Sequence, residues 1–222
     1  MVLISNKNVT STNSQISFDS EFLNFSSSCV FLGTRLDHKL NFADHTQYVL
    51  DKVSKNTGIL YRIKDDMTPQ ARLNYYYALM YPYLSYNIVV WGSTFRCHLD
   101  PLVLIQKRII RIIAGAEFLA HTSPLFKEFR VLKFDDIFIY SVCIYMFKAI
   151  KNGCFTPQHN LNTRHGHEIS STQNRLTTTQ HRLSFTGPKI WNELPPFLHE
   201  ISSLPLFKRK LKNYLIDQYS SL

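Results

Sequence analysis

The chain has 222 residues and 45% of them are hydrophobic, which is enough to build a packed core and excludes a disordered polymer. Twenty-five Lys and Arg against 16 Asp and Glu give a net charge of +9 and a pI near 9.4. Such an excess favours polyanionic partners, either nucleic acid or an anionic membrane surface. Between residues 138 and 216 there are ten Lys or Arg and three acids, so the C-terminal half is the basic half.

The sequence shows neither a secretion signal nor a membrane-spanning segment. The start, Met1 to Ser5, lacks the charged region and long apolar run of a secretion signal. The longest apolar stretch, Ile137 to Phe147, is shorter than the roughly 20 residues of a membrane helix. We therefore expect no membrane anchor and an intracellular protein, nuclear or cytoplasmic and not secreted. Its scattered cysteines are predicted to be reduced thiols: Cys29, Cys97, Cys143 and Cys154.

The first 40 residues predict a small β-hairpin. Residues 5 to 15 are polar, and Gly33 marks a bend or a close approach within the apolar run from Cys29 to Leu36. Three helices are then predicted from their capping residues, namely 44–55 from Asp44, 68–84 from Thr68 before Pro69, and 100–114 from Asp100 before Pro101.

Helical periodicity divides the third of these segments into two faces. Apolar residues recur on one face, at Leu102, Ile105, Ile109 and Ile112. Lys107 and Arg111 lie on the opposite side, with Arg108 at the border. From the residues alone, these cations fit a solvated helix face as well as they fit phosphate contacts.

The second half of the chain predicts a short helix from Ser123 before Pro124 and an apolar helix that Asp135 caps and that ends near Lys151. Residues 153–185 are polar and basic, which indicates loops or short strands, and an amphipathic helix follows at 204–215. The predicted fold is therefore mainly α with a small β part: an N-terminal hairpin, a helical bundle, a basic loop-rich region and a terminal helix.

Two acidic motifs imitate the metal-binding carboxylates of a polymerase. In Phe42-Ala43-Asp44-His45 a histidine replaces the second carboxylate, so Asp44 is better interpreted as a helix cap. Asp135 and Asp136, taken with Asp37, leave open a degenerate two-metal site. A helix cap with an acid in the first turn explains the same pair through the helix dipole.

Other catalytic or metal sites have little support. The cysteine and histidines of the loop-rich region do not have the paired spacing of structural zinc, and they are Cys154, His159, His165, His167 and His181. No Gly-X-Ser-X-Gly nucleophile motif is present. We expect no metal and no cofactor in this chain.

A series of short segments resembles, in order, the reverse transcriptases of LINE-type (non-LTR) retrotransposons, jockey-like or related elements. Phe31-Leu32-Gly33 with Leu36-Asp37, Leu40, Phe42 and His45 resembles the primer-grip strand and the segment after it. The remaining segments are Gly58 to Tyr61, Tyr81 to Leu84 with Tyr86, Trp91-Gly92, Leu104 to Arg108, Ile110 to Ile113, His121 to Phe126, Asp136-Ile137, Asn162 to Arg164, Gly187 to Asn192 and Leu194-Pro195. Phe42 stands where the family usually has Trp, Arg35 where it has an aliphatic residue and Asp135 where it more often has a neutral one.

The resemblance implies a division into residues 1–40 with the primer-grip strand, 41–116 as a thumb-like helical bundle, and 117–222 as the region after the thumb. Both acidic motifs then lie outside the palm, and the catalytic carboxylates are expected before residue 1. Magnesium is implied only for the full-length enzyme, and a separate protein carrying palm and fingers is a possible partner.

The resemblance also gives the cations a role, because a polymerase thumb contacts the phosphates of RNA, DNA or an RNA–DNA duplex. The candidate nucleic-acid-binding residues are Phe31, Leu32, Gly33, Lys107, Arg108, Arg111, Arg164, Arg175, Arg182 and Lys189. Aromatic Tyr81, Tyr83 and Trp91 are expected to fill the core rather than to stack on bases.

Three functions follow from the sequence. The first is a fragment of a reverse transcriptase that binds primer–template or RNA without catalysis. The second is a degenerate polymerase that uses Asp37, Asp135 and Asp136. The third is a non-catalytic interaction module or a translated relic.

Overall fold

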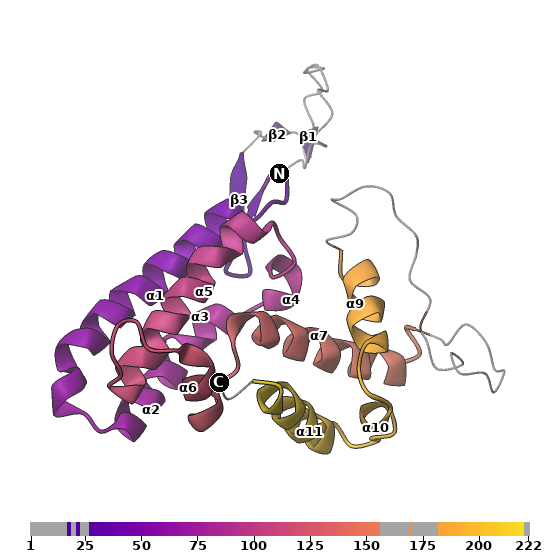
Figure 1. The fold of residues 1–222 in the computed structure, drawn as a ribbon. Helices are drawn as coiled ribbons and strands as arrows, with labels where there is room; N and C mark the ends of the chain where they lie inside the picture. The colour runs from indigo at the N-terminus through magenta and orange to yellow at the C-terminus, as the bar shows by residue number, and fades with distance from the viewer. Residues whose placement is uncertain (1–16, 19–20, 23–26, 156–168, 170–181, 220–222) are drawn as a thin grey trace.

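The computed structural model describes residues 17–18, 21–22, 27–155, 169 and 182–219. Helices dominate, and the strands lie at the N-terminal end, so the predicted mainly α fold with a small β part is confirmed (Figure 1). No helix in these ranges is long and apolar enough to cross a membrane.

The β part consists of two antiparallel pairs. Strand β1 (Ser17–Phe18) pairs with β2 (Glu21–Phe22), and β3 (Ser28–Phe31) pairs with β4 (Thr34–Asp37). In the second pair Phe31 lies opposite Thr34, which leaves a loop of two residues between the strands. The predicted hairpin is therefore present, but Leu32 and Gly33 form its turn and not part of its strand.

A compact connection joins this hairpin to the first helix. The buried carboxylate of Asp37 accepts backbone N–H bonds from Lys39 (2.9 Å), Asn41 (3.1 Å) and Phe42 (2.7 Å). Helix α1 (Ala43–Ile63) starts there, after Phe42 in the left-handed conformation. The predicted cap at Asp44 is wrong, since Asp44 lies in the first turn, where an acid still interacts favourably with the helix dipole.

The next segment folds back along α1. A 3-10 turn (η1, Lys64–Asp66) precedes α2 (Pro69–Leu79), and Thr68 caps α2 as predicted, with its hydroxyl accepting the Ala71 N–H at 3.2 Å. The predicted helix to residue 84 is broken, because Pro82 has no N–H to continue the ladder. The chain forms instead α3 (Tyr81–Ser85) and α4 (Ile88–Trp91).

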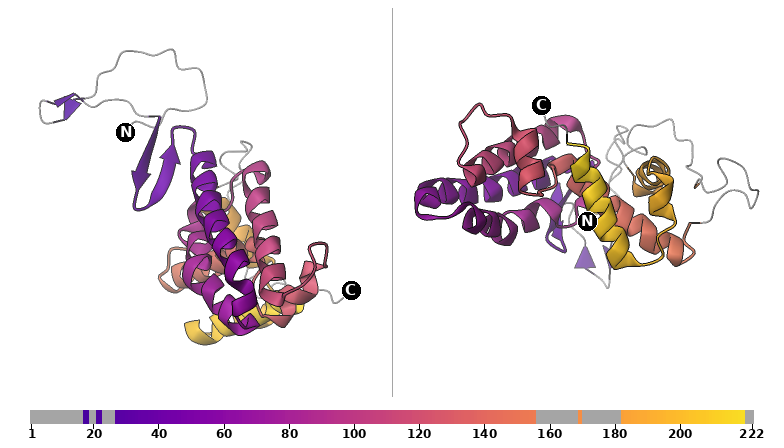
Figure 2. Two further views of the ribbon diagram at one scale, coloured as in Figure 1. Left: turned by 90° about the vertical axis from the view of Figure 1, so that its left-hand side faces the viewer. Right: turned by 60° about the horizontal axis from the view of Figure 1, so that its bottom comes forward.

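Helix α5 (Arg96–Ala114) runs beside α1 in the same direction, as the left view of Figure 2 shows. At one end Thr94 donates to the Asn41 carbonyl, just before α1. The predicted start at Asp100 is wrong, because Pro101 lies inside the helix. An ion pair between Arg96 and Asp100, 2.7 Å long, spans the additional first turn.

The C-terminus of α5 is closed by two devices. Gly115 has a φ of 68° and Ala116 N–H bonds to the Arg111 carbonyl at 3.0 Å, which is a Schellman motif. The guanidinium of Arg72 on α2 donates to the carbonyls of Ile112 (2.9 Å) and Ile113 (3.1 Å). The carbonyls of Arg111, Ile112 and Ile113 near the end of α5 are thereby satisfied within the fold.

The second half of the chain is built around α7 (Phe134–Lys151), which packs against α3, α4 and α5 and also against α9 (Leu183–Asn192) and α11 (Leu204–Asp217) (Figure 1). Two short helices, α6 (Thr122–Glu128) and α10 (Pro196–His199), complete the described part. The predicted cap at Asp135 is wrong: α7 begins at Phe134, so Asp135 and Asp136 both lie in its first turn.

Trp91 is fully buried in the core, as predicted. Tyr81 and Tyr83 are half-buried and pack against this core. Burial raises the pKa of Tyr81 to about 12.

Packing explains the segment Gly187 to Asn192. A Cβ at Gly187 would lie 2.7 Å from the Met146 sulfur, so glycine allows α9 to approach α7 closely. Trp191 packs against Phe207 with ring centroids 5.7 Å apart. The Asn192 amide bonds both backbone groups of Ile169, each at 3.0 Å. In the described structure this segment therefore has a packing role.

A polar contact fixes the C-terminal helix to the start of α7. The hydroxyl of Tyr219 donates to Asp136 and accepts the Lys133 backbone N–H at 2.9 Å. Burial raises the pKa of Asp136, and the Tyr219 hydrogen bond works against this shift.

We expect Tyr219→Phe to destabilise the protein by about 1–3 kcal/mol, because Asp136 and the Lys133 N–H lose their partner in a half-buried site. Urea unfolding followed by circular dichroism measures this change. Tyr214→Phe is the matched control, since the described residues offer no hydrogen bond to the hydroxyl of Tyr214. Equal stability of the two variants would contradict the interpretation.

Candidate nucleic-acid interface

The predicted primer-grip residues form the tip of the β3–β4 hairpin. Leu32 and Gly33 have φ values of 46° and 78°, the conformation of a type I′ turn. The Tyr86 hydroxyl donates to the Leu32 carbonyl at 2.7 Å, and Asn87 donates to the Thr34 hydroxyl at 2.9 Å. A Cβ at Gly33 would lie 3.5 Å from the Tyr86 ring. The tip is thus fixed to the connection between α3 and α4.

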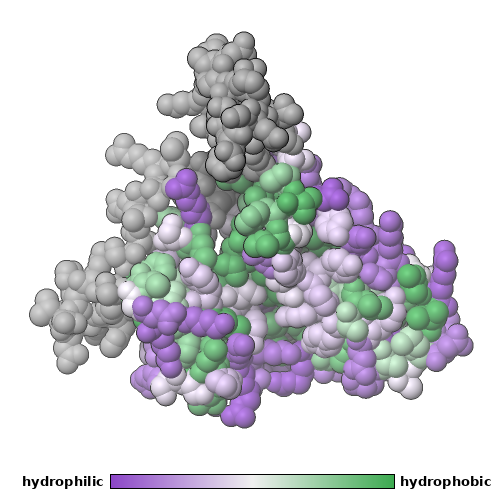
Figure 3. Space-filling model, turned by 180° about the vertical axis from the view of Figure 1, so that it is seen from behind, coloured by the Kyte–Doolittle hydropathy of each residue, from purple (hydrophilic) through white to green (hydrophobic). Residues whose placement is uncertain are grey.

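This tip exposes apolar side chains. Val30, Phe31 and Leu32 are 62 to 74% exposed. Full burial of each of these side chains would contribute roughly 1.5–3 kcal/mol of stability. Tyr86 is exposed beside them. Figure 3 shows a hydrophobic area in the upper part of the molecule. An exposed apolar cluster of this kind is typical of a contact surface.

We expect Tyr86→Phe to loosen the hairpin turn, because the Leu32 carbonyl loses its donor. The backbone amides of β3 and β4 should exchange hydrogen faster, and global stability should fall by only about 0.5–1.5 kcal/mol. Hydrogen exchange read by mass spectrometry tests this. Tyr83→Phe, whose hydroxyl has no described hydrogen bond, should leave the exchange unchanged. Unchanged exchange in Tyr86→Phe would show that the hydroxyl does not fix the turn.

A buried histidine supports the base of the hairpin. His45 is 2% exposed, and its Nδ1 accepts the backbone N–H of Arg35 at 3.3 Å. Its ring makes a T-shaped contact with the ring of Trp91, with the two centroids 5.2 Å apart. Its Nε2 has no hydrogen-bond partner within the described part of the chain. Burial, followed by the charge of Arg35, lowers the pKa of His45. The neutral ring is therefore the form that fits the fold.

His45 binds a proton more readily in the unfolded chain than in the folded chain, because its pKa is lowered by folding. The neutral His45 therefore contributes stability above pH 6.5, and this contribution is lost as the pH falls below that value. His45→Asn keeps an acceptor but cannot titrate. We expect its urea midpoint to fall less than that of the wild type between about pH 7.5 and about pH 5.5. His121→Asn, at an exposed histidine, should keep the wild-type slope. If the urea midpoint of His45→Asn falls with pH as much as that of the wild type, His45 does not cause the loss of stability.

The three predicted cations of α5 lie on its open side. Arg108 is exposed, and Lys107 and Arg111 are half-buried. Arg111 donates through Nε to the Ala120 carbonyl at 2.8 Å, so it also holds the loop after α5. Within the described ranges, Lys107, Arg108 and Arg111 form no ion pair. The charges of Lys107, Arg108 and Arg111 are therefore not neutralised by an acid.

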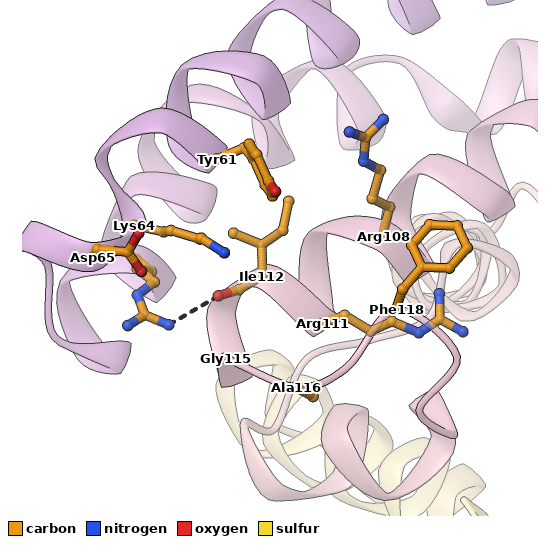
Figure 4. Close-up of a pocket in the computed structure, with 10 residues that line it drawn as sticks. Tyr61, Lys64, Asp65, Arg108, Arg111, Ile112, Gly115, Ala116 and Phe118 are labelled. Carbon is orange, nitrogen blue, oxygen red and sulfur yellow. Dashed lines mark hydrogen bonds between the residues drawn. The ribbon is translucent and has the colours of Figure 1, made fainter.

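Arg108 and Arg111 line a pocket of about 350 Å³ at the C-terminal end of α5 (Figure 4). Its other charged lining residues are Lys64, Asp65 and Arg72, and Tyr61 and Phe118 contribute aromatic rings. Four cations against one acid give the pocket an excess positive charge.

The sequence did not predict Lys64, Arg72, Tyr61 and Phe118 as site residues, since they lie outside the periodic face of α5. Tyr61 was named only as part of the family-like segment Gly58 to Tyr61, and α1 extends beyond its predicted end at residue 55 to Ile63.

The structure separates the hairpin from this pocket. Arg35 of β4 lies 4.6 Å above the Tyr48 ring near the start of α1, whereas Tyr61, near the end of α1, lines the pocket. At 1.5 Å per residue, these two positions on α1 are roughly 20 Å apart. The hairpin tip and the α5 cations are thus two surfaces and not one site.

The remaining predicted cations are distributed elsewhere. Arg182 immediately precedes α9 and Lys189 lies within it, and both are exposed. Arg164 and Arg175 lie outside the described residues.

The three carboxylates of the alternative catalytic site have separate partners. Asp37 accepts three backbone N–H bonds, Asp135 pairs with Arg96, and Asp136 accepts from Tyr219. No group of three His, Cys, Asp or Glu side chains that could hold a metal ion occurs among the residues described. The described geometry gives no support to a degenerate two-metal centre.

Comparison with known proteins finds similarity to RNA-directed DNA polymerases of mobile elements. The chain is 26% identical over 110 residues to the RNA-directed DNA polymerase from mobile element jockey of Drosophila melanogaster, a match that covers 48% of this chain and 12% of that polymerase. It is 25% identical over 112 residues to the probable RNA-directed DNA polymerase from transposon X-element of the same fly, with the same coverage. The jockey polymerase of Drosophila funebris matches 58% of this chain at 25% identity and is covered to 15%.

The chain thus spans about an eighth of the curated relatives that it matches. No protein-family model and no solved structure matches it. The matches support the relationship to non-LTR retrotransposon reverse transcriptases that the sequence motifs predict.

Proposed function

We propose that this chain is a segment of a retrotransposon RNA-directed DNA polymerase that binds primer–template or RNA and has no catalytic carboxylates of its own. Residues 1–40 carry the primer-grip hairpin, 41–116 the thumb-like bundle and 117–222 the region after the thumb. The observation that carries the proposal is the open, unneutralised cationic side of α5, in a chain whose relatives are RNA-directed DNA polymerases.

The dimensions agree with one extended ligand. The hairpin and the α5 pocket are separated by roughly 20 Å along α1, which corresponds to about six nucleotide steps of roughly 3.4 Å each. The α5 cations contact phosphates, and the hairpin backbone lies near the primer end, where Gly33 permits close approach. Such contacts set the register of a nucleic acid without reading its sequence.

The apolar tip gives the hairpin a second role. Val30, Phe31 and Leu32 carry no charge for phosphates, so we assign them to contact with the protein part that holds palm and fingers. In this arrangement the cations bind nucleic acid and the hairpin tip joins the catalytic part.

We expect the protein to bind an RNA–DNA duplex, with an affinity that falls steeply between about 50 and 200 mM salt as bound phosphates release counterions. The double variant Lys107→Ala/Arg108→Ala should weaken binding and reduce the slope of log K against log salt by about 2. Fluorescence anisotropy with a labelled duplex measures both quantities.

The matched control is Arg209→Ala/Lys210→Ala, which removes the same charge from exposed positions on α11. Its salt slope should stay close to that of the wild type. Equal losses in both double variants would show a net-charge effect and exclude α5 as the contact surface. If the wild type binds no nucleic acid at any salt, the function is wrong, and the exposed hairpin would favour a protein-interaction module.

A further inference from the structure

The pocket at the end of α5 combines cations with exposed aromatic rings. Tyr61 is 51% exposed and Phe118 is 78% exposed, and both line the pocket. In Figure 4 Tyr61 lies on the α1 side of the pocket and Phe118 lies next to Arg111, while the buried Ile112 adds apolar surface to the lining. The Lys64 ammonium lies 4.6 Å from the centroid of the Tyr61 ring, so a positive charge is held next to an aromatic surface.

The positive charge of the pocket is available to a ligand. Arg72 is occupied by the carbonyls of Ile112 and Ile113, and this contact offsets the negative end of the α5 dipole that would otherwise repel an anion. The side chains of Lys64 and Arg108 have no ion pair and no hydrogen bond within the described ranges. The charges of the exposed Arg108 and the half-buried Lys64 are therefore not neutralised by an acid beside the aromatic rings.

We propose that this pocket binds an unpaired nucleotide of a single-stranded segment, with the base against Tyr61 and Phe118 and the phosphate at Lys64 and Arg108. The inference deepens the proposed nucleic-acid binding and rests on it. A volume of about 350 Å³ lies in the range of small-ligand pockets. Stacking on aromatic side chains beside a cationic backbone track is the usual chemistry of single-strand binding.

A duplex and a free nucleotide fit the pocket less well. Paired bases inside a duplex do not offer their faces to the two rings, whereas an unpaired base does. A free triphosphate is usually held with a metal ion or by a glycine-rich phosphate loop. Among the described residues, no group of three His, Cys, Asp or Glu side chains could hold a metal ion. Gly115 is the one glycine in the lining of this pocket, so the lining has no glycine-rich loop. A single-stranded segment needs only one phosphate to be neutralised here.

The test compares a labelled twelve-nucleotide oligo-dT with a blunt duplex of the same length, using the full chain and fluorescence anisotropy at one low salt concentration. The double variant Tyr61→Leu/Phe118→Leu keeps apolar side chains and removes the rings. We expect it to bind the single strand about tenfold or more weakly, and the duplex with less than about a twofold change. Tyr145→Leu, at an exposed aromatic of α7, is the control and should bind both probes like the wild type.

A second measurement reports on the pocket directly. Tyr61→Trp places an indole in the lining, and oligo-dT should quench its fluorescence with the same dissociation constant that anisotropy gives. Quenching by the duplex as strong as by oligo-dT would overturn the proposal. Thymidine monophosphate that displaces the oligonucleotide at equal nucleotide concentration would identify a free-nucleotide site instead.

The outcomes separate this inference from the proposed function. Duplex binding with an intact salt slope, together with no effect of Tyr61→Leu/Phe118→Leu on the single strand, would refute the pocket and leave the proposed function standing. Absence of binding to both probes would refute both. Loss of single-strand binding in the Tyr145→Leu control would show that surface aromatics act without regard to position, and would also refute the pocket.

Discussion

The carboxylate of Asp37 is the contact on which the arrangement of the molecule depends. By accepting the N–H groups of Lys39, Asn41 and Phe42, its buried side chain closes the short connection between β4 and α1. Thr94 then bonds the Asn41 carbonyl and brings the start of α5 to the same place. An acid that three backbone donors satisfy is a structural group, because its lone pairs are already committed. The Asp37 carboxylate thus joins the hairpin to α1, and the Thr94 bond holds the start of α5 beside this connection.

The parallel course of α1 and α5 decides where function can lie. Their common start carries the apolar hairpin tip and the buried His45, while their ends meet α2 and form the cationic pocket. Arg72 is essential to that end, since it satisfies the last carbonyls of α5 and allows the surrounding cations to attract anions. The proposed protein contact at one end and the proposed phosphate contact at the other are therefore physically separate, and mutations can address them one at a time.

Much of the fold was predictable from local signals, and the errors have local causes. Thr68 before Pro69 was recognised correctly because an N-cap depends on neighbouring residues alone. Asp100 before Pro101 has the same pattern, yet α5 already begins at Arg96, and an Arg96–Asp100 ion pair spans the first turn. Asp135 imitates a cap, but Phe134 enters the core and begins α7 one residue earlier. For the site, periodicity placed Lys107, Arg108 and Arg111 on the open side of α5, whereas Tyr61, Lys64 and Phe118 come from other segments and have no such pattern.

By itself, the sequence determined the mainly α class, the basic character, the order of six helical segments and the relationship to retrotransposon reverse transcriptases, because these follow from composition, periodicity and short motifs. Only the tertiary structure decided that Leu32 and Gly33 form a turn held by Tyr86, and that Asp37, Asp135 and Asp136 each have a different partner. Only the tertiary structure showed that Lys64 and Tyr61 line the same pocket as Arg108. The physical reason is that hydrogen bonds and charge clusters between distant segments depend on how helices pack, which no local pattern encodes.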